Sequence, residues 1–167
     1  MTSLTKSVRR MLTVGIALSA LCAGSASAKA DSIVQKLNER NINYTVSDDN
    51  YIYAKLKLKS GRSQTIVISG STQQIMGQDV RLMLSPVAQV PEGQGNARIP
   101  LDPMAQDLLK NNSDILMGGW DFSGGYRYFQ VKIIDNVDAA TLQKLMLNLG
   151  SFADRKEMES GGERDQF

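Results

Sequence analysis

The sequence predicts an α+β domain, an antiparallel sheet of about five strands with helices packed on one face, in the order α-β-β-β-α-β-β-α. Three observations support this fold class. Residues 51–59 alternate apolar and polar side chains for five cycles, which is the period of a half-buried strand. Residues 115–134 have the pattern of a hairpin around a glycine-rich turn. Residues 139–158 repeat apolar side chains at spacings of three and four, as in a helix that lies on a sheet.

The chain after residue 30 begins with a predicted helix over residues 31–41. Ser32 and Gln35 have the spacing of a capping box, so we expect the helix to start there. Residues 44–46 form a brief predicted strand, and the polar run 47–50 is typical of a turn.

The strand at 51–59 and the segment 62–69 are predicted to form a hairpin whose register depends on the loop. A two-residue loop would set Lys59 opposite Arg62, and like charges directly opposite each other destabilise a sheet. A three-residue loop over 59–61 avoids this and puts Gly61 where a left-handed residue is needed. We therefore predict the second register, which pairs Ile52 with Ile68, Ala54 with Ile66 and Leu56 with Gln64.

Residues 75–88 hold the next predicted strand, followed by a loop over 90–100 and a helix from Asp102 to about Lys110. Pro86 is expected to end the central part of this strand or to mark a sheet edge, because proline has no N–H for a ladder. The two faces of the strand carry Val80, Leu82 and Leu84 on one side, and Asp79, Arg81, Met83 and Ser85 on the other.

The last predicted elements are a hairpin, 115–122 with 126–134, and a helix over 139–158 that Asp138 caps. Trp120 and Phe122 are expected to pack against this helix, although their place beside a glycine turn would also suit a ligand clamp. The apolar face of the helix consists of Leu142, Leu145, Met146, Leu149, Phe152 and Ala153. Residues 31–158 thus form one predicted domain, and residues 159–167 a flexible polar tail.

Residues 1–30 have the pattern of a secretory signal peptide. Three basic residues precede an uncharged run over 11–22, and the small residues 26–28 follow as a cleavage site. The run is shorter than the roughly 20 apolar residues of a spanning helix. We expect cleavage after Ala28 or Ala30, which would leave a periplasmic or secreted protein without a transmembrane segment.

Composition excludes several classes of chemistry for the chain after residue 30. Four of the 19 basic residues precede residue 31, which leaves 15 against 17 acidic residues, so nucleic-acid binding is not indicated. Cys22 is the one cysteine and there is no histidine. Cysteine nucleophiles, Ser-His-Asp triads and zinc sites of the His or Cys type are therefore excluded. We predict no catalytic residue, no metal and no cofactor.

The candidate binding residues lie on the predicted strands. Tyr51, Tyr53, Lys55 and Lys57 alternate along one strand and so share a face, which would suit an extended peptide or an anionic ligand. A solvated outer face is the alternative, since antiparallel sheets commonly have one. The predicted partner-binding set is Tyr51, Tyr53, Lys55, Lys57, Met83, Tyr126 and Tyr128.

Four stretches of the chain together resemble the YbjN-like family, the putative bacterial sensory transduction regulators. They are residues 33–46, 48–69, 104–133 and 140–157, and they share with that family patterns of spacing and not of chemistry. The family is similar in fold to the class I type III secretion chaperones. The resemblance implies a non-enzymatic binding or regulatory domain with no catalytic residues to carry over.

The sequence therefore favours an exported domain that engages a protein or peptide partner, and a homodimer is compatible with it. Two other functions stay open. A carboxylate-dependent envelope hydrolase would need two acids that converge in a cleft at roughly 5–10 Å. A structural or assembly component of the envelope would show a large exposed apolar patch.

We predict that the exported protein lacks its first 28 or 30 residues, because a signal peptidase cleaves after small residues. N-terminal sequencing of the protein from an envelope fraction measures this directly. An intact leader on protein found in the cytoplasm would contradict the prediction.

Overall fold

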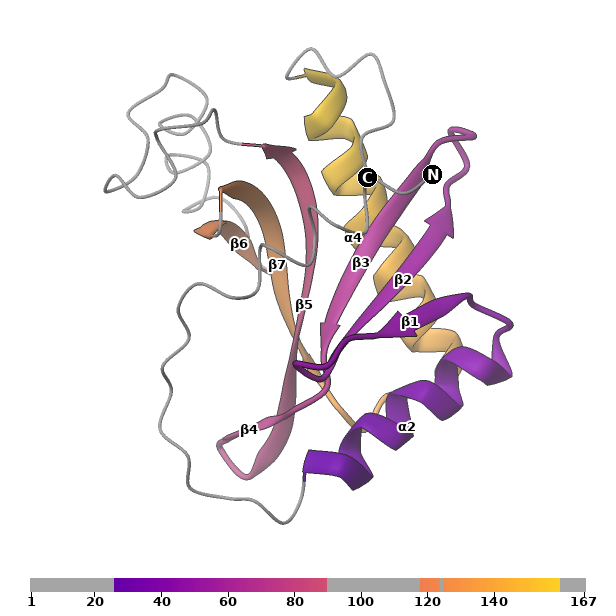
Figure 1. The fold of residues 1–167 in the computed structure, drawn as a ribbon, viewed down its shortest axis with the longest axis vertical. Coiled ribbons are helices and arrows are strands. Elements are labelled where there is room, and N and C mark those ends of the chain that lie inside the picture. Colours follow the sequence, from indigo (N-terminus) through magenta and orange to yellow (C-terminus); the bar gives the residue numbers. More distant parts are fainter. Residues whose placement is uncertain (1–25, 90–117, 124, 160–167) are drawn as a thin grey trace.

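The computed structural model describes residues 26–89, 118–123 and 125–159. Within them the chain forms one antiparallel sheet of seven strands and two helices (Figure 1), which confirms the α+β class with two strands more than predicted. The elements are α2 Ala26–Glu39, β1 Tyr44–Val46, β2 Tyr51–Lys57, β3 Ser63–Ser69, β4 Gln73–Ile75, β5 Gln78–Gln89, β6 Gly119–Ser123, β7 Tyr126–Ile134 and α4 Ala139–Glu159. The predicted loop 90–100, helix 102–110 and most of the signal peptide and tail lie outside the described residues.

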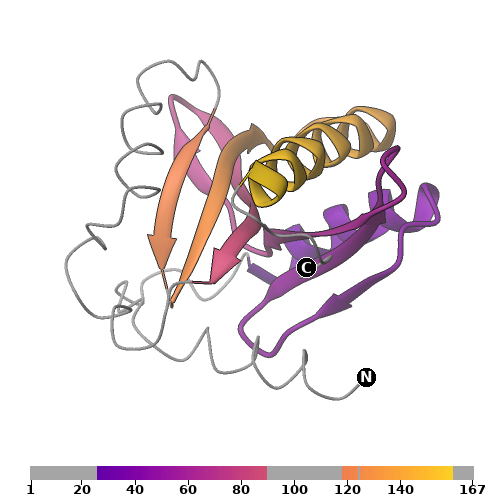
Figure 2. The same cartoon turned by 90° about the horizontal axis from the view of Figure 1, so that it is seen from above.

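Both helices lie on the same side of the sheet, as predicted. The strand order is β1-β2-β3-β5-β7-β6, with β4 paired to the end of β5. Helix α4 lies across β3, β5 and β7, and α2 contacts α4 beside it (Figure 2). Side chains of both helices share one core cluster with the strands: Ile33 and Leu37 from α2, Leu142, Met146 and Leu149 from α4, and Ile52, Ile66 and Ile68 from the sheet.

The predicted register of the β2–β3 hairpin is confirmed. Ile52 pairs with Ile68, and Ala54 with Ile66, across a loop in which Gly61 has a φ of 88°. The Gly61 N–H donates to the Leu58 carbonyl at 3.0 Å, which closes the turn. The charge argument therefore identified the loop correctly, because the alternative register would have opposed two cations.

Three of the four predicted helix ends agree with the structure: the end of α2 and both ends of α4. Thr141 N–H donates to the Asp138 carboxylate at 2.8 Å, which confirms the predicted cap of α4. This backbone bond, with a second from the Thr141 hydroxyl, lowers the pKa of Asp138. Helix α2 ends in a Schellman motif, with Asn41 at a φ of 52° and the Ile42 N–H bonded to the Leu37 carbonyl.

The predicted start of α2 is wrong, because the helix begins at Ala26 and Ser32 lies inside it. Ser32 therefore cannot be an N-cap, and the capping-box spacing was coincidental. Cleavage at either predicted site would fall within α2. Cleavage after Ala30 would leave a helix that begins at Asp31, where the sequence pattern placed it.

Strand β5 continues through Pro86 to Gln89, but its pairing with β3 ends at Leu84, so Pro86 lies where this side of β5 has become unpaired, in agreement with the prediction of an edge. The ladder between β3 and β5 is short, with Val67 opposite Leu84 and Ile68 opposite Met83. On the other side of β5, the register of the pairing with β7 shifts at a bulge between Pro86 and Ala88. Proline is thus tolerated here because its missing N–H lies where the β3–β5 ladder has already stopped.

The side chain of Gln64 bridges the place where this ladder stops. Its amide nitrogen donates to the Pro86 carbonyl at 3.2 Å, and its amide oxygen accepts the Thr65 N–H at 3.2 Å. Ser85 adds a second bridge from its hydroxyl to the Thr65 carbonyl at 2.9 Å. Gln64 and Ser85 are completely buried, so side-chain hydrogen bonds replace backbone bonds between the two strands.

The helix-facing side of β5 carries Arg81, Met83, Ser85 and Val87, all buried. The register with β3 decides this, because Met83 lies opposite the core residue Ile68. Met83 is 0% exposed, so its placement in a partner-binding set is wrong. A completely buried side chain cannot offer a contact to another molecule.

The sequence did not reveal the β4–β5 hairpin, which was predicted as one strand. Met76 and Gly77 form its two-residue turn, with φ values of 50° and 76°. Turns with two positive φ values strongly prefer Asn-Gly or Asp-Gly, so Met-Gly gave no signal.

Trp120, Phe129 and Phe152 form an aromatic cluster between the sheet and α4. The ring centroids of Phe129 and Phe152 are 4.3 Å apart, and those of Trp120 and Phe129 are 4.9 Å apart. Trp120 is 5% exposed. These contacts support the expected packing against the helix over the ligand-clamp alternative.

We predict that Gln64→Leu lowers the free energy of unfolding by about 2 kcal/mol, because the buried Pro86 carbonyl loses its amide donor at similar side-chain volume. Chemical denaturation measures the change. Gln73→Leu on the exposed strand β4 is the matched control and should shift stability by less than about 0.5 kcal/mol. Equal effects of both substitutions would show that the bridge is not needed.

Candidate functional site

Six of the seven predicted binding residues lie on the face of the sheet opposite the helices, here called the outer face. On β2, Ile52, Ala54 and Leu56 are buried under the helices, so the alternating residues Tyr51, Tyr53, Lys55 and Lys57 lie on the outer face. On β7, Phe129 and Ile133 face the core. The alternation therefore brings Tyr126 and Tyr128 to the outer face as well.

The middle of the outer face is apolar. Val67 of β3 lies directly between Tyr53 of β2 and Leu84 of β5, because each pair is opposite in register. Val67 is 8% exposed, and Leu82 and Leu84 are half-buried. The tyrosines of β2 and β7 thus lie on either side of a small aliphatic group, and Ser63, Thr65 and Ser69 of β3 make the rest of this strand's outer face polar.

The tyrosine hydroxyls on this face lie in a poorly solvated environment. Burial raises the pKa of Tyr53 to about 12, with smaller contributions from Tyr51 and Asp49. Burial also raises the pKa of Tyr128, followed by contributions from Tyr126, Tyr53 and Asp121. The rings of Tyr126 and Tyr128 are 6.3 Å apart. Tyr53 of one half of the sheet thus lies near enough to Tyr128 of the other half to contribute to its raised pKa.

The hydroxyl of Tyr53 is buried and has no hydrogen-bond partner in the described structure. Buried hydroxyls nearly always have a partner, and an unsatisfied one costs about 1–3 kcal/mol. The Tyr53 ring therefore packs on the outer face with its hydroxyl shielded by this chain's own atoms.

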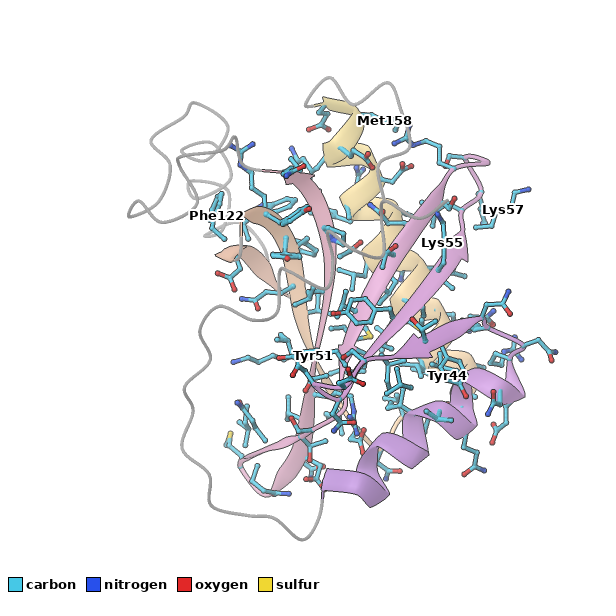
Figure 3. The ribbon with its side chains drawn as sticks, in the orientation of Figure 1. Tyr44, Tyr51, Lys55, Lys57, Phe122 and Met158 are labelled. Atoms are coloured by element: carbon cyan, nitrogen blue, oxygen red, sulfur yellow. The ribbon has the colours of Figure 1, made fainter. Side chains whose placement is uncertain are left out.

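Lysines border the tyrosines at one edge of the outer face. Lys55 and Lys57 are exposed, and Figure 3 shows them projecting from the β2–β3 hairpin. Lys59 continues the same alternation in the loop and is exposed too. None of the three forms an ion pair within the described part of the chain.

A second group of polar residues, which the sequence did not reveal, joins the hairpin to α4. The Arg62 guanidinium donates to the Asp154 carboxylate and lies 3.1 Å from the Glu157 carboxylate. The hydrogen bond to Asp154 is the main cause that raises the pKa of Arg62. The carboxylates of Asp154 and Glu157 are 5% and 2% exposed. Two buried acids that share the partly exposed Arg62 form a structural ion pair.

A third polar group surrounds Arg81, which is completely buried on the helix side of β5. Its Nε donates to the Asp135 carboxylate at 2.7 Å, and its Nη1 donates to the Ser69 carbonyl. Lys36 of α2 donates to the Asp135 carbonyl at 2.7 Å. These bonds tie α2 to the ends of β3 and β7, so we assign this group to the fold.

The described residues contain neither a candidate metal-binding cluster nor a helix that could span a membrane. No group of three His, Cys, Asp or Glu residues there could hold a metal ion. Neither described helix is long and apolar enough to cross a membrane. In the comparisons with known proteins, no family model and no curated protein matches the chain.

We predict a loss of stability as the pH rises from 10 towards 12. The raised pKa of Tyr53 means that folding favours its neutral phenol, so this contribution is complete below the ordinary pKa of 10.0. It is lost at higher pH, because the unfolded chain releases the proton first. Tyr53→Phe should flatten the alkaline decline in melting temperature. An unchanged decline would show that the hydroxyl is solvated.

Proposed function

We propose that this chain is an exported, non-enzymatic binding or regulatory domain that engages a protein or peptide partner through the outer face of its sheet. The observation that carries the proposal is that Tyr51 and Tyr53 of β2 share one face of the sheet with Tyr126 and Tyr128 of β7. The resemblance to the YbjN-like regulators supports a binding role as well.

Tyrosine suits such a surface for physical reasons. Its ring supplies a large contact area with few rotatable bonds, and its hydroxyl needs a hydrogen-bond partner when it is buried. Interfaces are enriched in tyrosine at the centre and carry polar residues at the rim. The outer face has this arrangement, with tyrosines and aliphatic residues inside and Lys55 and Lys57 outside.

The carboxylate-dependent hydrolase is the weaker proposal. Asp154 and Glu157 do converge, but both bind Arg62 and are almost completely buried. A hydrolytic pair must reach a substrate and must keep one carboxylic acid protonated, which a bound guanidinium opposes. These contacts favour a role for the pair in holding α4 against the hairpin.

We predict that a double substitution Tyr51→Ala, Tyr53→Ala abolishes partner binding while the domain stays folded. Chemical crosslinking in the native envelope, followed by mass spectrometry, identifies the partner and measures its loss. Both residues are only half-buried on the outer face, so the core under α4 should remain intact.

The matched control is the double substitution Tyr51→Phe, Tyr53→Phe, which keeps both rings and removes both hydroxyls. It should retain most of the partner binding, because the rings keep their contact area, and circular dichroism checks the fold of both variants. A folded alanine variant that captures its partner at full strength would show that the outer face is not the binding site.

A further inference from the structure

Strand β1 covers only part of the outer edge of β2. Its three residues lie opposite Ile52, Tyr53 and Ala54, and the last bond to β2 runs from the Lys55 N–H to the Asn43 carbonyl at 3.3 Å. Figure 1 shows that the upper part of β2, near the hairpin, has no strand beside it on this side. Within the described residues, about half of this sheet edge therefore has no paired strand.

The open half presents the backbone of Lys57. The Ser47 N–H donates to the Tyr51 carbonyl, and the Lys55 N–H to Asn43, so odd-numbered residues of β2 direct their backbone groups towards β1. Leu58 instead bonds to Arg62 of the hairpin. By this alternation the N–H and C=O of Lys57 point away from β3, to the side where the described structure has no further strand.

The same segment carries an uncompensated row of positive charge. Lys55 and Lys57 alternate along β2 and so lie about 7 Å apart on one face, and Lys59 is exposed in the hairpin loop that follows. Like charges at this spacing repel one another, and no carboxylate of the described residues pairs with them. The acids Asp48 and Asp49 lie at the opposite end of β2, before Tyr51.

We infer that the partner presents an acidic extended peptide segment, which pairs with the open edge at Lys57 and sets its carboxylates against the lysine row. This inference rests on the proposed function and specifies the chemistry of the partner. An extended peptide repeats its side chains on one side every two residues, which matches the spacing of the lysines. Hydrogen bonds between the main chains of the peptide and β2 would provide affinity. The charges of the lysines would provide specificity for an acidic peptide sequence.

The structure disfavours the same segment of a second copy. Lysines on an open edge repel an identical edge, which is a common protection against self-association.

The test uses a short synthetic peptide that alternates Glu with Thr as the probe, titrated into the full exported chain. We expect Lys57→Glu to weaken binding about tenfold, since one attraction becomes a repulsion. Lys144→Glu, an equal charge change at an exposed position of α4, should leave the affinity within about twofold. Binding should also weaken as salt rises from about 0.05 M to about 0.3 M.

Three outcomes would overturn the inference. Equal affinities of the Lys57→Glu and Lys144→Glu variants would show that the lysine row does not take part. Equal binding of a peptide with Lys in place of Glu would remove the charge selectivity. Tighter binding of a sulfated polysaccharide than of the acidic peptide would assign the site to an anionic polymer.

The crosslinked envelope partner separates this inference from the proposed function. The partner could be lost from the Tyr51→Ala, Tyr53→Ala variant and still bind the Lys57→Glu variant in full. This result would overturn the inference of an acidic peptide segment and would leave the proposed function intact. If no envelope partner depends on the tyrosines, the proposed function fails, whatever the probe peptide does.

Discussion

The junction between β3 and β5 is the constraint on which the rest of the structure depends. One half of the sheet is β1-β2-β3 and the other is β5-β7-β6, and backbone pairing joins them at only two residue pairs. The amide of Gln64 and the hydroxyl of Ser85 continue the connection where the ladder stops at Pro86. The tyrosines of the outer face come from both halves, so their convergence depends on this junction.

Two buried ion pairs hold the helices over the same junction from its two ends. At one end, Arg62 of the hairpin joins Asp154 of α4. At the other, Arg81 of β5 joins Asp135, whose backbone binds Lys36 of α2. Between them, Gly150 of α4 lets the helix approach the sheet closely, since a Cβ there would lie 3.3 Å from Leu58 and 3.5 Å from Gln64. Buried charges with fixed partners specify one helix position, because a shifted helix would leave them unpaired.

Local patterns in the sequence predicted the parts of the fold that local physics decides. The β2–β3 register followed from the charges of Lys59 and Arg62, and the cap of α4 from Asp138. The sequence-based prediction failed where contacts between residues far apart in the sequence determine the direction or partner of a side chain. The inward direction of Met83 depends on its pairing with Ile68, and Asp154 meets Arg62 across 92 residues of sequence. Four tyrosines could be proposed as a surface from alternation alone, but their convergence needed the strand order.

The outer face combines an apolar middle with a charged edge, and this gradient follows from the strand order. Strand β5 lies in the middle of the sheet and carries Val80, Leu82 and Leu84 on this face, all half-buried. Strand β2 lies near one edge and carries the tyrosines and then the lysines. A solvent-exposed sheet face usually carries polar residues on its central strand as well. Polar side chains there would not disturb the core, because the core lies on the other face of the sheet. The apolar central strand, its tyrosine border and its cationic rim are the arrangement on which the proposed binding role of this face rests.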